Sequence, residues 1–263
     1  MNIIEQLKSQ SRNALKDNRV AATAGVLLFA AAISFVYIVF LIMGTAGDIW
    51  DENGALKAGN DIFITVMMCI CVLTAVAVSP FKNGFMRLCY NIAKGNKGDV
   101  SDMFYFFKRN KYLNTIEFNL IIALKVLFRL ILGLIPYFAV KAMTYFFSVQ
   151  LLTTVTANDI FEVVSAVLFV LGCIAGLILS VKLFADEFAY IEYEDDLDSV
   201  FKVSKIIKKK YSKSYFALFF SFAPWILLSL LVIPAIYVLP YLTTSFANSS
   251  KWLILLYKEG KIV

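Results

Sequence analysis

Histidine is absent from this chain of 263 residues. Its absence removes the commonest general base near neutral pH, the imidazole metal ligand, and any serine–histidine or cysteine–histidine nucleophile pair. No glycine loop of the Walker or dinucleotide-binding type occurs either. Only carboxylate or lysine chemistry remains open, so we expect a protein that is not an enzyme and that uses no metal and no cofactor.

Cysteine is scarce, and the positions of the four cysteines are informative. Cys69, Cys71, Cys89 and Cys173 fall mostly within apolar runs, and none lies in a segment that we place outside the cell. The pattern therefore predicts no disulfide framework. For Cys69 and Cys71 it favours packing as small apolar side chains over metal ligation.

Charge is also scarce, because 17% of the residues are charged while 60% are hydrophobic and the mean hydropathy is +0.75. These values are typical of an integral membrane protein. Apolar runs of about 20 residues recur, which is the length that crosses about 30 Å of hydrocarbon. The first run is too long for the core of a signal peptide, so we interpret it as a retained span. We expect one all-α domain, a polytopic transmembrane helix bundle with about six spans, at approximately 20–43, 62–81, 116–140, 160–184, 215–233 and 235–257.

Lysine and arginine are distributed unevenly between the loops. Residues 1–19 hold four of them, and residues 82–115 and 182–214 hold seven each. The intervening loops, 44–61 and 141–159, hold only Lys57 and Lys141. Because basic residues near span ends stay on the cytoplasmic side, the N-terminus is predicted to be cytoplasmic in a bacterial cytoplasmic membrane.

The stretch 221–241 is apolar but carries three of the five prolines, Pro224, Pro234 and Pro240. A single span here would have a broken hydrogen-bond ladder and would leave the lysine-containing C-terminal tail outside. Division near 233–235 returns that tail to the cytoplasm, so we favour six spans over five and expect both termini inside. The polar run from 243 to 250 must then face other helices rather than lipid.

The second half of the chain resembles a known family. An acidic turn, EYEDDLDS, leads into a lysine-rich helix, then into SFAPW at a span entry, and then into a Pro-Tyr pair. The matching positions are Ser204, Lys208, Ser221, Phe222, Trp225, Pro240 and Tyr241. With LKSQSRNALKDN and DMFYFFKRNKYLN nearer the N-terminus, this order resembles a bacterial integral-membrane family, domain of unknown function 975. The resemblance implies a six-span helical fold and no established activity. In the fourth span, this chain has LGCIAGL where the family usually carries Ile-Pro-Gly.

Acidic and basic side chains alternate in blocks before the expected fifth span. The acids are Asp186, Glu187, Glu192, Glu194, Asp195, Asp196 and Asp198, and the bases are Lys202, Lys205, Lys208, Lys209, Lys210 and Lys213. One interpretation is a divalent-cation site beside a seat for anionic lipid headgroups. The other is a solvated connector, with acids near the start of a helix around Ser199 and bases near the next span. For the acids we favour the connector, and for the lysines both interpretations stay open.

A second mixed segment, 99–114, interleaves aromatic residues with Lys108, Arg109 and Lys111. Because it runs into a span, we interpret it as an interfacial helix whose cations meet anionic lipid. Nucleic-acid binding is not expected.

Two cations lie within the third expected span. Lys125 and Arg129 are four residues apart and share one helix face. Cations at this depth are costly, so they are candidates for a functional site unless they snorkel or pair with an acid. The carboxylates available to them are Glu117, on the same helix, and Glu162, at the outer end of the fourth span.

The expected function is that of a non-enzymatic envelope or transport-associated component that acts through anionic membrane lipids or through a protein partner in the membrane. The alternative is a small transporter or channel subunit for an anionic or amphipathic solute, with Lys125 and Arg129 lining its path.

Overall fold

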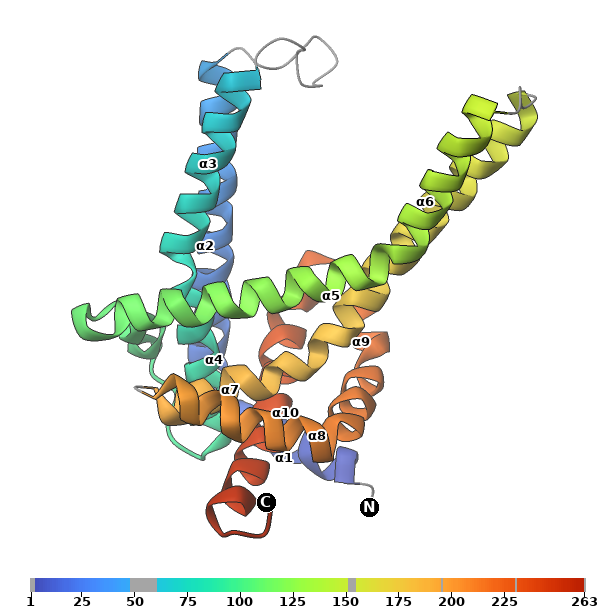
Figure 1. The fold of residues 1–263 in the computed structure, drawn as a ribbon. Coiled ribbons are helices and arrows are strands. Elements are labelled where there is room, and N and C mark those ends of the chain that lie inside the picture. Colours follow the sequence, from blue (N-terminus) through green and yellow to red (C-terminus); the bar gives the residue numbers. More distant parts are fainter. Residues whose placement is uncertain (1–2, 48–60, 151–154, 195, 230, 263) are drawn as a thin grey trace. The chain divides into compact units, whose positions relative to one another are not determined.

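The computed structural model describes residues 3–47, 61–150, 155–194, 196–229 and 231–262 (Figure 1). Throughout these ranges the secondary structure is helical, without a strand. The helices are α1 (Ile3–Lys16), α2 (Arg19–Ala46), α3 (Asp61–Val78), α4 (Pro80–Ala93), α5 (Arg109–Gln150), α6 (Val155–Ser180), α7 (Phe184–Tyr193), α8 (Leu197–Ser221), α9 (Ala223–Leu228) and α10 (Val232–Lys258). Two 3₁₀ helices, η1 (Val100–Phe107) and η2 (Val181–Leu183), connect α4 to α5 and α6 to α7.

Four helical stretches are long and apolar enough to cross a membrane, by length and composition. They are Arg19–Ala46, Ile62–Ala93, Arg109–Phe146 and Phe161–Tyr193. Their apolar parts correspond to the first four expected spans. The all-helical class is therefore confirmed and a multi-pass membrane protein is supported, whereas six spans are not confirmed.

The proline-rich stretch 221–241 contains a junction between helices, as predicted when this stretch was divided between two spans. The helix α8 ends at Ser221, α9 has Pro224 in its first turn, and α10 begins at Val232. Proline suits the first turn of a helix because a backbone N–H at that position would have no intrahelical acceptor. The expected fifth span, 215–233, is consequently not one helix, and α9 with its six residues is only about 9 Å long.

The polar run in α10 is buried in protein. Its Asn248 side chain donates a hydrogen bond of 2.8 Å to Ser11 in α1, and its Ser250 hydroxyl lies 2.7 Å from the Tyr215 hydroxyl in α8. The helix also packs against α4 and α7. The run faces other helices, as expected, but α10 is not among the four candidate spans because so many of its residues are polar.

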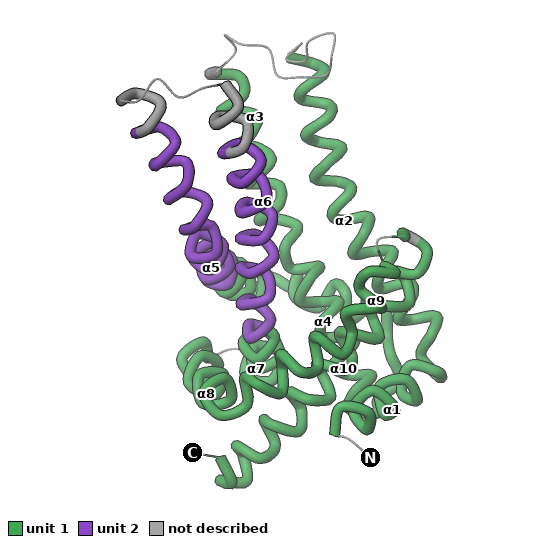
Figure 2. The backbone as a smooth tube through the Cα atoms, turned by 90° about the vertical axis from the view of Figure 1, so that its right-hand side faces the viewer, with its two compact units in different colours: residues 1–119, 184–263 green, residues 120–183 purple. Residues whose placement is uncertain are grey.

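Backbone contacts divide the chain into two compact units (Figure 2), and the single-domain organisation stays a prediction. Unit 1 comprises residues 1–119 and 184–263. Its helices α2 and α3 lie side by side (Figure 1), and a buried apolar cluster joins α2 to α4 and η1. Gly84 allows the backbone of η1 to approach α4, because a Cβ there would lie 2.3 Å from the Met103 carbonyl oxygen.

Unit 2, residues 120–183, contains the C-terminal part of α5, α6 and η2 (Figure 2). A Cβ at Gly133 of α5 would lie 2.3 Å from the carbonyl oxygen of Gly172, and one at Gly176 would lie 2.8 Å from the Leu130 Cα. Small residues of this kind let membrane helices approach closely. The glycines of LGCIAGL therefore form the contact between α5 and α6.

Candidate functional site

The acidic residues of α7 and the turn after it point into unit 1. Asp186 is fully buried and Glu187 is 6% exposed, while Glu192 and Glu194 are half-buried. A buried carboxylate is stable only when cations or hydrogen-bond donors surround it. The interpretation of this segment as a solvated connector is wrong for these four residues, because each of them binds a cation from another helix.

Asp186 joins α7 to α8. Lys208 Nζ donates to its two carboxylate oxygens at 2.7 and 2.9 Å, and the buried Ser204 hydroxyl donates to it as well. Ser204 and Lys208 are two of the positions that carry the family resemblance. Lys208 is therefore held against α7 inside unit 1, while its contact with anionic lipid stays a prediction.

Glu187 and Glu192 join α7 to α4 and α10. Lys82 Nζ lies 2.6 Å from the Glu187 carboxylate. Glu192 accepts from Lys94 of α4 at 2.7 Å and from Lys258 of α10 at 2.5 Å. It also accepts a hydrogen bond of 3.1 Å from the Tyr90 hydroxyl.

Glu194 joins the same region to η1 and to the start of α5. It pairs with Arg87 and with Lys111, and it accepts from the Tyr105 hydroxyl at 2.8 Å. The Arg87 guanidinium lies 3.4 Å from the Tyr105 ring centroid and also pairs with Asp102 at 3.3 Å. Lys111 is thus paired inside the protein, while the lipid contact that its sequence context predicted stays a prediction.

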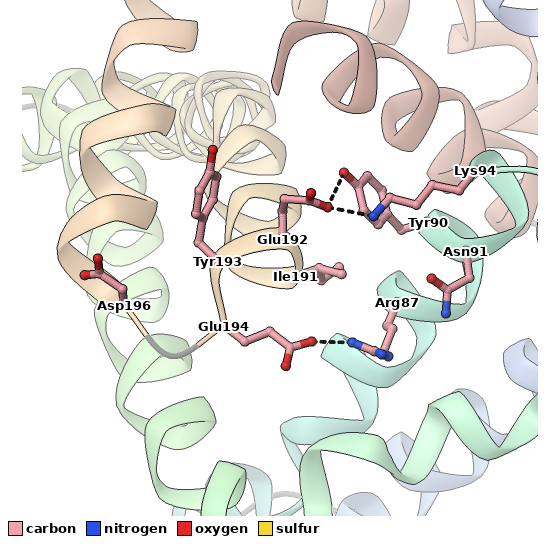
Figure 3. A pocket seen from close by; sticks show the side chains of 9 residues that line it. All are labelled: Arg87, Tyr90, Asn91, Lys94, Ile191, Glu192, Tyr193, Glu194 and Asp196. Carbon is pink, nitrogen blue, oxygen red and sulfur yellow. Dashed lines mark hydrogen bonds and ion pairs between the residues drawn. The ribbon is translucent and has the colours of Figure 1, made fainter. Parts of the chain in front are cut away.

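A polar pocket of about 460 Å³ opens beside these pairs (Figure 3). Its lining consists of Arg87, Tyr90, Asn91, Lys94, Ile191, Glu192, Tyr193, Glu194 and Asp196. In Figure 3, Glu192 reaches toward Tyr90 and Lys94, and Glu194 reaches toward Arg87. Both cations of the lining are engaged by carboxylates, so the pocket offers no uncompensated charge to an anion. In the described part of the chain no group of three or more acidic or cysteine side chains could hold a metal ion.

Asp196, at the rim of this pocket, caps the N-terminus of α8. Its carboxylate accepts from the Ser199 hydroxyl at 2.5 Å and from the Ser199 backbone N–H at 3.1 Å. These bonds hold the pKa of Asp196 below its ordinary value of 3.8. The cap therefore stabilises the folded state above that value and is lost as the pH falls through the lowered pKa. A helix start near Ser199 with acids at its N-terminus is confirmed.

The other expected lipid-contacting cations are on the surface. The exposed ones are Lys202, Lys205, Lys209, Lys210, Lys213, Lys108 and Arg109. Along α8, Lys202, Lys205 and Lys209 recur at spacings of three and four residues, so they follow one helix face. Lys213 follows four residues later, beyond a kink at Tyr211, and is exposed as well.

Lys125 and Arg129 of α5 lie within unit 2 and are half-buried. The Arg129 guanidinium donates a hydrogen bond of 2.9 Å to the Leu179 carbonyl, in the last turn of α6. A helix C-terminus favours a nearby cation. Glu162 is exposed and lies 17 residues from Leu179 on the same helix, about 25 Å along its axis. The structure therefore does not bring Glu162, one of the carboxylates available in the sequence, close to Arg129. Glu117, the other available carboxylate, is exposed.

The remaining family-motif positions gather around α1. Lys8 of α1 donates to the Ser221 carbonyl at 2.6 Å and lies 4.3 Å from the ring centroid of the buried Phe222. Its partial burial lowers the pKa of Lys8. The Phe222 ring meets Tyr241 edge-on at 5.0 Å. Trp225, Pro240 and Tyr241 line a second pocket together with residues of α1 and α2.

The sequence did not predict the cluster of cations around Tyr105 or the contacts of the family-motif positions with α1. Tyr105, which meets three cations, stood unremarked among the aromatics of 99–114, although its place between Asp102 and Lys108 in the sequence was a local signal. The contribution of α1 to the second pocket has no local signal, because it depends on residues more than 200 positions apart.

No family model, curated protein or solved structure matches this chain. The resemblance to domain of unknown function 975 is carried by the quoted residues alone.

The Asp186–Lys208 pair gives a direct test of the buried charges. Lys208→Met leaves the carboxylate without its cation, so we expect it to lower the free energy of unfolding by about 3 kcal/mol. Lys209→Met, on the exposed side of the same helix, is the matched control and should change it little. Adding Asp186→Leu to Lys208→Met should recover most of the loss, since Ser204 keeps its hydrogen bond to the Phe201 carbonyl. Denaturant unfolding in detergent, followed by circular dichroism, measures all three. Equal stability of Lys208→Met and Lys209→Met would contradict this account.

Proposed function

We propose that this chain is a non-enzymatic, multi-pass component of the bacterial cytoplasmic membrane that acts through contact with anionic lipid. The observation that carries the proposal is one face of α8, which we term the lysine face: Lys202, Lys205, Lys209 and Lys213. All four side chains are exposed. The opposite face of the helix packs into unit 1 through the buried residues Val200, Val203, Ile207 and Leu218.

Five of the described acids that precede the lysine face are engaged elsewhere. Four of them, on α7 and the turn after it, are bound by cations of unit 1, and Asp196 is engaged in capping α8. Asp198, in the first turn, is the exposed acid on the same side of α8. Each lysine near an anionic membrane surface contributes about 1 kcal/mol of attraction. The sign and the arrangement of the charges favour a membrane surface as the partner.

The proposal requires α8 to lie on the cytoplasmic side. The excess of basic residues in alternate loops supports a cytoplasmic N-terminus, and four spans then return the chain to the cytoplasm before α8. Four and six spans both place the C-terminus with the N-terminus. A cytoplasmic leaflet rich in anionic lipid would then be the surface that the lysine face meets.

Cysteine labelling in intact cells tests this topology. In a variant without the native cysteines, Lys261→Cys should resist a membrane-impermeant maleimide until the cells are permeabilised. The control is Ala46→Cys, exposed at the far end of α2, which should label in intact cells. Labelling of Lys261→Cys from outside would require an odd number of spans and would remove the proposed orientation.

Lipid retention tests the lysine face itself. We expect the protein purified from a mixture of phosphatidylglycerol and phosphatidylcholine to retain phosphatidylglycerol preferentially in native mass spectrometry. Changing all four lysines of the face to glutamine should reduce that preference, because about 1 kcal/mol of attraction is lost with each charge. The control removes the same charge at exposed lysines elsewhere, Lys97, Lys141, Lys210 and Lys261. Equal lipid profiles for the two variants would contradict a lipid-binding role of the lysine face and would leave its lysines only the role of orienting the spans.

The alternative function, a small transporter or channel subunit, requires Lys125 and Arg129 to line a hydrated path. The hydrogen bond from Arg129 to the end of α6 favours a structural role for this cation instead.

A further inference from the structure

A second pocket of unit 1, which we term the α1–α10 pocket, has a volume of about 440 Å³. Its lining comes from the end of α1, the start of α2, α9 and α10: Arg12, Leu15, Lys16, Arg19, Ala22, Thr23, Trp225, Ile236, Tyr237, Pro240 and Tyr241. This volume lies within the range of small-ligand sites, about 300–1,000 Å³.

The walls of this pocket are held in place by contacts that are distant in sequence. Asn248 donates to Ser11 and fixes α10 against α1, while Lys8 donates to the Ser221 carbonyl and fixes the end of α8, directly before α9, against α1. The Asn18 side chain, between α1 and α2, accepts from the Gly98 backbone N–H at 2.7 Å. The pocket is therefore part of the fold, since each wall is anchored to another helix.

The charges in the lining have one sign. Arg12, Lys16 and Arg19 are exposed, and none of the other lining residues is acidic. This distinguishes the α1–α10 pocket from the pocket beside α7, where carboxylates neutralise the cations. Three cations in a lining that contains no carboxylate favour an anionic group, and arginine in particular binds phosphate in a bidentate manner.

The rest of the lining is apolar or aromatic apart from Thr23. Trp225 is 48% exposed and Tyr237 67%, and Leu227, Leu231 and Ile233, which lie near them in the sequence, are exposed as well. Exposed apolar residues in such number are typical of a membrane or protein contact. Arg19 begins the first candidate span, so the cationic part of the pocket lies where α2 enters hydrocarbon. Cations at a span entry beside an exposed apolar surface match the two parts of a phospholipid, its headgroup and its acyl chain.

We propose that the α1–α10 pocket binds one anionic phospholipid. The phosphate contacts Arg12, Lys16 and Arg19, and the upper acyl chain lies along Trp225, Ile236 and Pro240. This inference goes beyond the proposed function, because it concerns a pocket for a single lipid on residues outside the lysine face. Either claim can fail without the other.

Fluorescence quenching of Trp225 tests the pocket, because bromine on an acyl chain quenches only a nearby tryptophan. The variant Trp50→Phe with Trp252→Phe leaves Trp225 as the only tryptophan of the chain. The full chain is reconstituted in phosphatidylcholine nanodiscs that contain a small fraction of brominated phosphatidylglycerol or, for comparison, brominated phosphatidylcholine. We expect stronger quenching by the anionic lipid, with saturation at one lipid per protein.

Arg12→Gln with Lys16→Gln should weaken the apparent binding of the anionic lipid by about 30-fold. Each lost cation removes about 1 kcal/mol of attraction, and about 1.4 kcal/mol corresponds to a tenfold change in affinity. Arg19 is retained in this variant because it directly precedes the span and helps to orient it. The matched control, Lys97→Gln with Lys210→Gln, removes the same charge elsewhere in unit 1 and should bind as before. A second variant, Thr23→Phe, fills the pocket without changing its charge and should abolish the preference.

The outcomes separate the possible occupants. Equal quenching by the two brominated lipids would overturn the proposal. An equal loss of binding in Arg12→Gln with Lys16→Gln and in the control Lys97→Gln with Lys210→Gln would overturn it as well. Competition by inorganic phosphate at millimolar concentration would assign the three cations to free phosphate and overturn the lipid assignment. Glutamine substitution of the lysine face should leave the quenching of Trp225 unchanged, and a parallel loss there would show general surface attraction instead of a pocket.

Discussion

The burial of four carboxylates in and beside α7 is the constraint on which the arrangement of unit 1 depends. A carboxylate removed from water must be paired, and an unpaired one would cost several kcal/mol. The partners come from α4, η1, α5, α8 and α10, so elements from most of the chain are tied to a segment of nine residues. Apolar packing between α2, α4 and η1 supplies a core, and the ion pairs specify which helix lies against which.

This arrangement has consequences for both proposed lipid contacts. Because α8 is tied to Asp186 through Lys208 on its inner side, the lysine face is turned outward and stays without an acidic partner on α7. Because α10 is tied to Glu192 through Lys258 and to α1 through Asn248, its N-terminal half closes one side of the α1–α10 pocket. Two sets of cations can therefore be distinguished. Those bound to the acids of α7 and the turn after it tie unit 1 together, and those on the lysine face and in the α1–α10 pocket are the ones that we propose to meet lipid.

Sequence reasoning found the features that depend on local composition. The four candidate spans follow from apolar runs of sufficient length, and the start of α8 follows from an acidic turn before Ser199. The junction near Pro234 was also predicted, because proline acts on its own helix. For α10 the span stays a prediction: its apolar residues indicate one, while its serine and asparagine side chains form buried contacts with α1 and α8, as expected for a polar run that faces other helices.

The ion pairs of α7 could not be predicted, because they join residues far apart in sequence. Glu194 and Arg87 are separated by 107 positions, and nothing beside either residue marks the other. A run of acids before a run of lysines is also what a solvated loop contains, so composition does not separate the two cases. The positive charge of the α1–α10 pocket could not be predicted for the same reason, because its cations come from residues 12–19 and most of its apolar lining from residues 225–241.

The coupling energy between Glu194 and Arg87 tests this account most directly. A double-mutant cycle with Glu194→Gln and Arg87→Met, measured by denaturant unfolding in detergent, isolates the interaction from the separate effects of the two substitutions. The exposed pair Glu259–Lys261 serves as the reference, and surface pairs of this kind contribute about 0–1 kcal/mol. The account predicts that the Glu194–Arg87 coupling exceeds the reference and reaches about 1–3 kcal/mol. A coupling no larger than that of the surface pair would contradict the claim that the carboxylates of α7 hold unit 1 together.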